Sequence, residues 1–362
     1  MNKKLFFPIF CALLIVVSLL VINGCGSAAS SGGGGGSSIA NRTGTFSYAG
    51  IQAPGEIWSW TISTETFSGT NETTGAYITG EWTILASGFG TMHVIGASTG
   101  DAVGKDAYFL EYKDTAIMVF PVGEVNNAIV CAARATAALT TGPKYICIKI
   151  PNAGPPSLSD VAYITAEVTW AGNLATFEIT EYMISGEYRP PRGGDTLTFS
   201  SSTGMLTPIA ANPERLFLTP SGMFIVDNGP GAGGAIGASK ESFSSIEAAN
   251  HEYRGVDFRY FPSGTSETYF IAATNNGSGS LKGYMYNGNN VESGIDTSSF
   301  VTFTFQSQEA TGIISTEVTQ GAYTTTVKSV FAKIGANQKY IWFGFNVNAS
   351  GGQENILFMQ TN

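Results

Sequence analysis

The stretch Val301-Thr-Phe-Thr-Phe305 alternates a large apolar side chain with a threonine at every step. Because successive side chains of a β-strand point to opposite faces, this period of two predicts a strand with one buried face. The same alternation occurs at residues 57–62, where two tryptophans share one face, and at residues 197–199. The recurrence of β-branched and aromatic residues in such short runs indicates a chain built mainly from strands.

Other apolar runs lack polar alternation. Ala116–Phe120 and Tyr340–Phe345 are apolar at nearly every position, which is typical of strands that are buried on both faces. The sequence Thr219-Pro-Ser-Gly222 suits a type I turn and predicts a hairpin between the apolar runs on either side of it. Helix signals are scarce, and Ser244–Asn250 is the best candidate for a short helix.

These patterns predict an all-β fold of tandem antiparallel β-barrels or sandwiches. The 362 residues suffice for two or three domains with cores of their own. Proline and glycine cluster at residues 151–156, which we interpret as a domain boundary, and a second boundary is expected near residues 248–251. The expected β domains are therefore residues 44–150, 151–247 and 248–362, of which the last two could also form one unit.

The composition is acidic but poor in charge. The formal net charge is −9, so the chain does not attract phosphate backbones, and nucleic acid is not an expected partner. Charged residues make up 12% of the chain, against a usual share of about 25%. Glycine, serine, threonine and asparagine replace them, as is common in exported β-proteins.

The N-terminus carries a targeting signal. Lys3 and Lys4 precede the apolar run Leu5–Ile22, which is followed by Ile22-Asn-Gly-Cys25 and a spacer that includes Gly32–Gly36. This order of basic, apolar and small residues before a cysteine resembles the signal of bacterial lipoproteins. The resemblance implies a signal peptide at residues 1–24 and a flexible Gly/Ser-rich tether at residues 25–43.

The same resemblance implies that the chain is cleaved after Gly24 and that Cys25 receives fatty acyl chains such as palmitate. Asn23 departs from the family, which usually has a small or aliphatic residue there. In lipoproteins of some Gram-negative bacteria an aspartate after the cysteine retains the protein at the inner membrane, so the resemblance, with Gly26 at that position, implies the outer membrane. Two alternatives remain open: Leu5–Ile22 is just long enough for a transmembrane helix, and the segment could also be an ordinary cleaved secretion signal.

Two cysteines, Cys131 and Cys147, remain in the body of the exported chain. Since thiols in an oxidising compartment usually pair, we expect a disulfide between them, with the strands around them paired; two buried free thiols are the alternative. His93 and His251 are the only histidines, so we expect no structural zinc site, and no motif indicates a cofactor.

Two motifs match enzyme patterns by spacing alone. Gly96-Ala-Ser98-Thr-Gly100 fits the G-x-S-x-G pattern of hydrolases, which requires a helix after the serine and a histidine nearby. Gly229–Gly234 fits G-x-G-x-x-G, but a strand-like or loop-like sequence follows where a dinucleotide site needs a helix. In a chain with 45 glycines such matches arise by chance, and we interpret the second as a wide turn.

Acidic and aromatic residues give two further candidate sites. A glycosidase needs two carboxyl groups at a set separation, and the first domain offers six glutamates for such a pair: Glu56, Glu65, Glu72, Glu81, Glu111 and Glu124. The tryptophans could form a glycan platform, but aromatic residues in strands are more often core.

Together these observations predict a lipid-anchored exported protein that acts as a non-catalytic binding or scaffold module of the cell envelope. Its expected partners are the membrane, through the anchor, and a glycan, a small apolar ligand or an envelope protein. The alternative function is an exported ester or glycoside hydrolase that uses Ser98 or a carboxylate pair.

Overall fold

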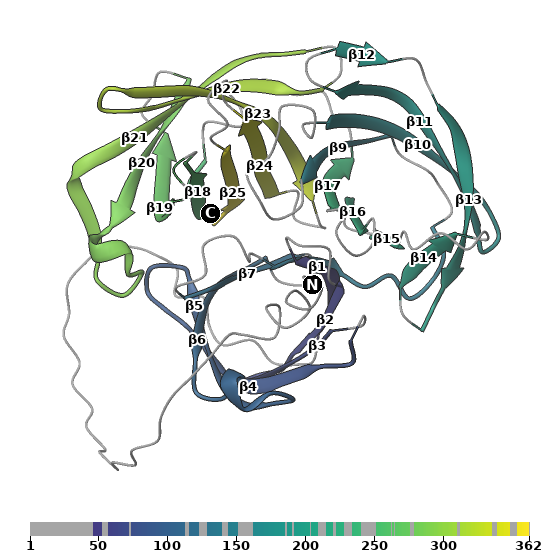
Figure 1. Cartoon of the computed structure of the whole chain (residues 1–362), viewed down its shortest axis with the longest axis horizontal. Coiled ribbons are helices and arrows are strands. Elements are labelled where there is room, and N and C mark those ends of the chain that lie inside the picture. The colour runs from purple at the N-terminus through teal and green to yellow at the C-terminus, as the bar shows by residue number, and fades with distance from the viewer. Residues whose placement is uncertain are drawn as a thin grey trace, which may run out of the picture.

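The structure is a computed structural model in which the chain forms three β-units around a common centre (Figure 1). It describes residues 46–361 except for 53–56, 72–73, 113–115, 123–128, 140–143, 151–161, 185–186, 190–191, 203, 209–214, 220–221, 228–233, 240–250, 262, 264, 276–278, 310–311, 335–338 and 348–352. The expected signal peptide at residues 1–24, the expected tether at residues 25–43 and the expected short helix at Ser244–Asn250 lie outside the described residues.

Barrel 1, at the bottom of Figure 1, is a closed meander of eight antiparallel strands in which each strand pairs with the next and the last pairs with the first. Its interior is filled by the tryptophans at positions 58, 60 and 82, by Phe67 and Phe109, and by smaller apolar side chains from alternate strand positions. The strands are β1 (Phe46–Gln52), β2 (Ile57–Ile62), β3 (Thr66–Asn71), β4 (Tyr77–Ile84), β5 (Gly90–Ala97), β6 (Asp106–Tyr112), β7 (Ala116–Pro121) and β8 (Ile129–Ala133), with a 3₁₀ turn η2 (Gly100–Ala102) after β5.

Sheet 2 has nine strands, and its pairings also return to their starting point, because β10 pairs with both β9 and β11. Both β12 and β13 pair with β11, so together they take the place of one strand. The strands are β9 (Lys144–Ile150), β10 (Ala162–Ala171), β11 (Leu174–Ile184), β12 (Glu187–Arg189), β13 (Arg192–Ser200), β14 (Met205–Pro208), β15 (Arg215–Leu218), β16 (Met223–Asp227) and β17 (Gly234–Ser239).

Barrel 3 is a second closed meander of eight strands. Its interior is packed around Trp342, whose ring stacks between those of Phe331 and Phe358 with centroids 5.0 and 4.8 Å away. The strands are β18 (Tyr253–Tyr260), β19 (Ser266–Asn275), β20 (Ser280–Tyr286), β21 (Ile295–Gln308), β22 (Ile314–Gln320), β23 (Tyr323–Ile334), β24 (Lys339–Val347) and β25 (Gln353–Gln360), with a 3₁₀ turn η4 (Asn287–Asn289).

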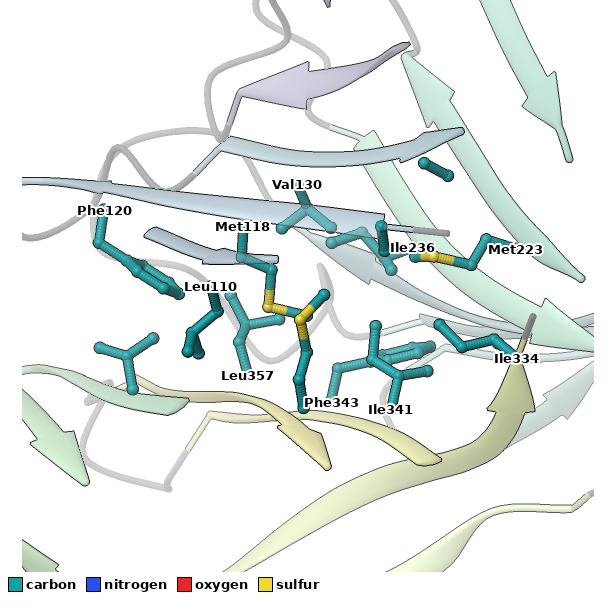
Figure 2. Close-up of a cluster of buried hydrophobic side chains, with 14 of the residues drawn as sticks. Leu110, Met118, Phe120, Val130, Met223, Ile236, Ile334, Ile341, Phe343 and Leu357 are labelled. Carbon is teal, nitrogen blue, oxygen red and sulfur yellow. The ribbon is translucent and has the colours of Figure 1, made fainter. Parts of the chain in front are cut away.

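A central hydrophobic core joins the three units. Figure 2 shows side chains of barrel 1, sheet 2 and barrel 3 that meet in one cluster. The labelled members are Leu110, Met118, Phe120 and Val130 of barrel 1, Met223 and Ile236 of sheet 2, and Ile334, Ile341, Phe343 and Leu357 of barrel 3. Strands that border this core therefore bury one face inside their own unit and the other face against the neighbouring units.

The structure confirms the all-β prediction of multiple barrels. Val301, Phe303 and Phe305 are buried while the threonines between them are half-buried, and Ala116–Phe120 is buried at every position because β7 borders the central core. The predicted hairpin also forms, since β15 pairs with β16 and the N–H of Gly222 donates to the carbonyl of Thr219 at 3.0 Å.

The first predicted domain boundary is wrong. β9 pairs with β10 and β17, so residues up to 150 do not all belong to barrel 1, whose last strand ends at Ala133. The expected boundary at residues 151–156 falls between β9, which ends at Ile150, and its paired neighbour β10, which begins at Ala162. Turns within a sheet and linkers between domains use the same residue types, so composition alone does not separate them.

Candidate functional site

Ser98 follows the last residue of β5 in barrel 1 and joins it to the first residue of β4. Its exposed hydroxyl accepts a hydrogen bond from the N–H of Tyr77 at 2.5 Å and donates to the carbonyl of Tyr77 at 3.4 Å. Only the three-residue η2 follows, whereas a nucleophile elbow needs a full helix. His93 lies five residues earlier on the same strand, roughly 16 Å away at about 3.3 Å per residue, and pairs with Asp106 at 2.8 Å.

Replacing Ser98 with alanine is therefore expected to cost stability and not activity. Loss of the two hydrogen bonds to Tyr77 should lower the free energy of unfolding by about 1 kcal/mol. Any hydrolysis of model esters by the wild-type chain should persist unchanged in the variant. An ester hydrolase activity that is abolished by Ser98→Ala, in a variant that still folds, would establish Ser98 as a nucleophile.

Of the six candidate glutamates, the structure describes three, all in barrel 1. Glu65 and Glu81 are exposed on barrel 1, and Glu111 is half-buried in β6. Glu56, Glu72 and Glu124 lie outside the described residues. The glycine motif ends at Gly234, where the strand β17 begins instead of the helix that a dinucleotide site requires. Among the residues that the structure describes, no group of three or more His, Cys, Asp and Glu side chains is arranged to hold a metal ion.

Cys131 is a free thiol inside barrel 1. Its strand β8 pairs with β1 and β7, whereas Cys147 lies in β9, which pairs with β10 and β17. The predicted pairing of these two strands is therefore wrong, and no bridge to Cys147 is formed in this structure. Burial raises the pKa of Cys131 above its usual value, so the side chain stays a protonated, unreactive thiol.

The polar end of barrel 3 is the strongest cluster of ionisable groups in the described part of the chain. We use this name for Asp257, Arg259, Tyr269, Gln320, Tyr323 and Glu354. The guanidinium of Arg259 donates from Nη2 to Asp257 Oδ2 at 2.7 Å, from Nε to Glu354 Oε1 at 3.1 Å and from Nη1 to Gln320 Oε1 at 2.5 Å. The side chains of Asp257, Arg259 and Glu354 are 0%, 7% and 2% exposed.

Two tyrosines flank the guanidinium of Arg259. Its central carbon lies 5.1 Å from the ring centroid of Tyr269 and 4.9 Å from that of Tyr323, a distance at which cation–π attraction adds to the ion pairs. Tyr269 also donates a short hydrogen bond to Glu267. The guanidinium is thus held on three sides by carboxyl and amide oxygens and flanked by aromatic rings.

Burial and charge perturb every ionisable group of the polar end. Burial, with the nearby charge of Asp257, raises the pKa of Glu354 to about 9, against the opposing effect of Arg259. Burial also raises the pKa of Asp257. The positive charge of Arg259 acts in the opposite direction but does not cancel this effect. Perturbed carboxyl pairs often mark acid–base sites, but these side chains are buried inside the barrel and already bind the cation of Arg259.

Sequence reasoning missed this cluster. The signal was present at residues 256–260, where Asp257 and Arg259 alternate with Val256 and Phe258. Alternation alone does not say which face points inward, and charged residues normally face water. Here the apolar face of β18 turns outward to the central core that joins the units, so the charged face fills the barrel.

No protein-family model and no curated protein sequence matches the chain. Among solved structures, one that the chain resembles is the crystal structure of a protein of unknown function from the DUF3598 family of Nostoc punctiforme. The two chains are 9% identical, the match covers 61% of this chain and 94% of that chain, and the TM-score is 0.16. A similarity at this level carries no argument about the function of this chain.

Proposed function

We propose that the chain is an exported, lipid-anchored protein of the cell envelope, attached to the outer membrane through Cys25, and that it acts as a non-catalytic binding or scaffold module. The observation that carries the proposal is the position of Cys25, directly after the apolar run Leu5–Ile22 and before a glycine-rich spacer. The first strand in the described part of the chain begins at Phe46, so about 20 residues separate Cys25 from the described body. A flexible chain of that length has a root-mean-square span of roughly 25 Å.

The packing of the body supports a rigid scaffold. Trp60 and Trp342 are 2% and 0% exposed in the interiors of barrels 1 and 3, where they pack against other aromatic rings. Filled interiors favour outer faces and loops as the binding surface, for a glycan or an envelope protein, over a small apolar ligand inside a barrel.

In the described part of the chain, no helix is long and apolar enough to cross a membrane.

Replacing Cys25 with serine is expected to release the protein from the membrane. Two or three acyl chains bind a bilayer durably, because each buried CH₂ contributes roughly 0.8 kcal/mol, and the variant has no sulfur to accept them. Fractionation of cells after labelling with a fatty acid should find the wild type acylated and membrane-bound and the variant unlabelled. Cys11→Ser, within the apolar run, is the matched control and should behave as the wild type. Mass spectrometry that finds residue 25 unmodified in a freely soluble wild-type chain would refute the anchor.

A further inference from the structure

Two carboxyl groups share one edge of the Arg259 guanidinium. Nε donates to Glu354 Oε1 and Nη2 donates to Asp257 Oδ2. These two nitrogens form the edge of the planar group that commonly receives both oxygens of a single carboxylate. The two donors therefore hold an oxygen of Asp257 beside an oxygen of Glu354. The strand register allows this arrangement, because Arg259 is directly opposite Glu354 and Asp257 lies two residues from Arg259 on the same face of β18.

One cation cannot balance two buried anions at this separation. All three side chains are at most 7% exposed, so water does not screen them. Two adjacent carboxyl groups in such a site share a proton rather than ionise together. Asp257 Oδ1 is buried without a hydrogen-bond partner, so this oxygen can accept a hydrogen bond from a further donor. A protonated neighbouring carboxyl group supplies that donor.

We propose that the polar end of barrel 3 is a proton-binding site in which Glu354 keeps its proton at neutral pH and donates it to Asp257, which stays ionised beside Arg259. The shorter bond from the guanidinium, 2.7 Å against 3.1 Å, assigns the negative charge to Asp257. The cluster then holds one cation and one anion. The raised pKa of Glu354, about 9, agrees with this assignment.

The two tyrosines that face the site do not titrate in the pH range in which Glu354 does. Glu267 and Tyr269 approach from β19 and Tyr323 from β23. Burial raises the pKa of Tyr269 to about 12 and that of Tyr323 above its usual value, so both stay neutral where Glu354 titrates. The inward positions nearby on β20 and β24 carry Met285, Gly344 and Asn346, which do not ionise.

The site makes barrel 3 sensitive to alkali. The pKa of Glu354 is higher in the folded chain than its ordinary 4.5, so the folded state retains a proton that the unfolded state loses. The stability from this proton is complete below about pH 4.5 and is lost as the pH rises through about 9. Deprotonation would place a second anion inside the barrel, next to the β18–β25 pairing that closes it.

The test compares the full chain in non-ionic detergent with its Glu354→Gln variant. Glutamine keeps the shape and a donor but does not titrate. The unfolding equilibrium constant of the wild type should rise, relative to that of the variant, by up to tenfold per pH unit between about pH 5 and 9. Denaturant titrations at a series of pH values measure the difference. Parallel stability profiles for the two proteins would overturn the proposal.

NMR of the carboxyl carbons measures the pKa of Glu354 directly, without a measurement of unfolding. The Glu354 carboxyl should titrate near pH 9 in the wild type. In Asp257→Asn, Glu354 becomes the counter-ion of Arg259, and its pKa should fall to the acid side. A Glu354 carboxyl that titrates near pH 4 in the wild type would show that both groups are ionised and would also overturn the proposal. Neither measurement depends on lipid attachment, so failure of the proposed anchor leaves this test intact.

Discussion

Replacing Arg259 with methionine is expected to lower the free energy of unfolding at pH 7 by about 3–5 kcal/mol. The variant would keep the bulk of the side chain but leave the Asp257 carboxylate buried without its cation, while Gln320 and Glu354 each lose a charge-assisted hydrogen bond. Loss of the cation raises the pKa of Asp257 further. The deficit should therefore shrink as the pH falls and Asp257 takes up a proton, which denaturant titrations at pH 5 and 7 can measure.

Lys328→Met is the matched control for Arg259→Met. Lys328 also binds a carboxylate, Glu309, at 2.6 Å, but the two side chains are 32% and 31% exposed. Water screens such a pair and can solvate the Glu309 carboxylate once Lys328 is removed. The expected loss in the free energy of unfolding is therefore at most about 1 kcal/mol. Equal losses in the two variants would show that the buried position of Arg259 contributes nothing beyond an ordinary surface ion pair.

Replacing Phe270 with alanine is expected to cost about 3–5 kcal/mol and to uncouple barrel 1 from barrel 3. Phe270 projects from the outside of barrel 3 into three rings of barrel 1, with centroids 5.6 Å away at Phe89, 5.0 Å at Tyr108 and 5.9 Å at Phe120. Calorimetry or denaturation should show a single transition in the wild type and separated transitions in the variant.

Phe300→Ala controls for the loss of a phenylalanine from the outer face of the same barrel. Phe300 is 44% exposed and lies under the ammonium group of Lys282 at 3.8 Å, so its removal should cost less than about 1 kcal/mol and leave the cooperativity unchanged. A Phe270→Ala variant that unfolds in the same single transition as the wild type would mean that other contacts couple the barrels. The hydrogen bond from Arg254 Nε to the carbonyl of Ser87, 3.0 Å long, would be the first such contact to examine.

Much of the fold could be predicted because strand periodicity is a local property. The alternation at Val301–Phe305 and the unbroken apolar run at Ala116–Phe120 each correspond to a strand with the expected burial. Four of the five tryptophans are buried in barrel cores, as aromatic residues in strands usually are. The turn at Thr219–Gly222 is equally local, since four residues determine its geometry.

The candidate sites could not be predicted in the same way. Ser98 matched a motif, yet its hydroxyl binds the main chain of Tyr77 because a motif specifies spacing and not the partners that catalysis needs. The pairing of the strands around Cys131 and Cys147 was wrong because both strands are apolar and the register between distant strands is not local information.

The sequence by itself determined the strand-rich character of the body and its turns, because each of these depends on neighbouring residues. The N-terminal signal and the lipid anchor at Cys25 stay predictions from the sequence. Only the tertiary structure decided that three units pack around one core. It also decided that Arg259 and the carboxyl groups of Asp257 and Glu354 meet inside barrel 3. The physical reason is that closure of a barrel and burial by a neighbour choose which face of a strand points inward, and that choice is made by residues far apart in the chain.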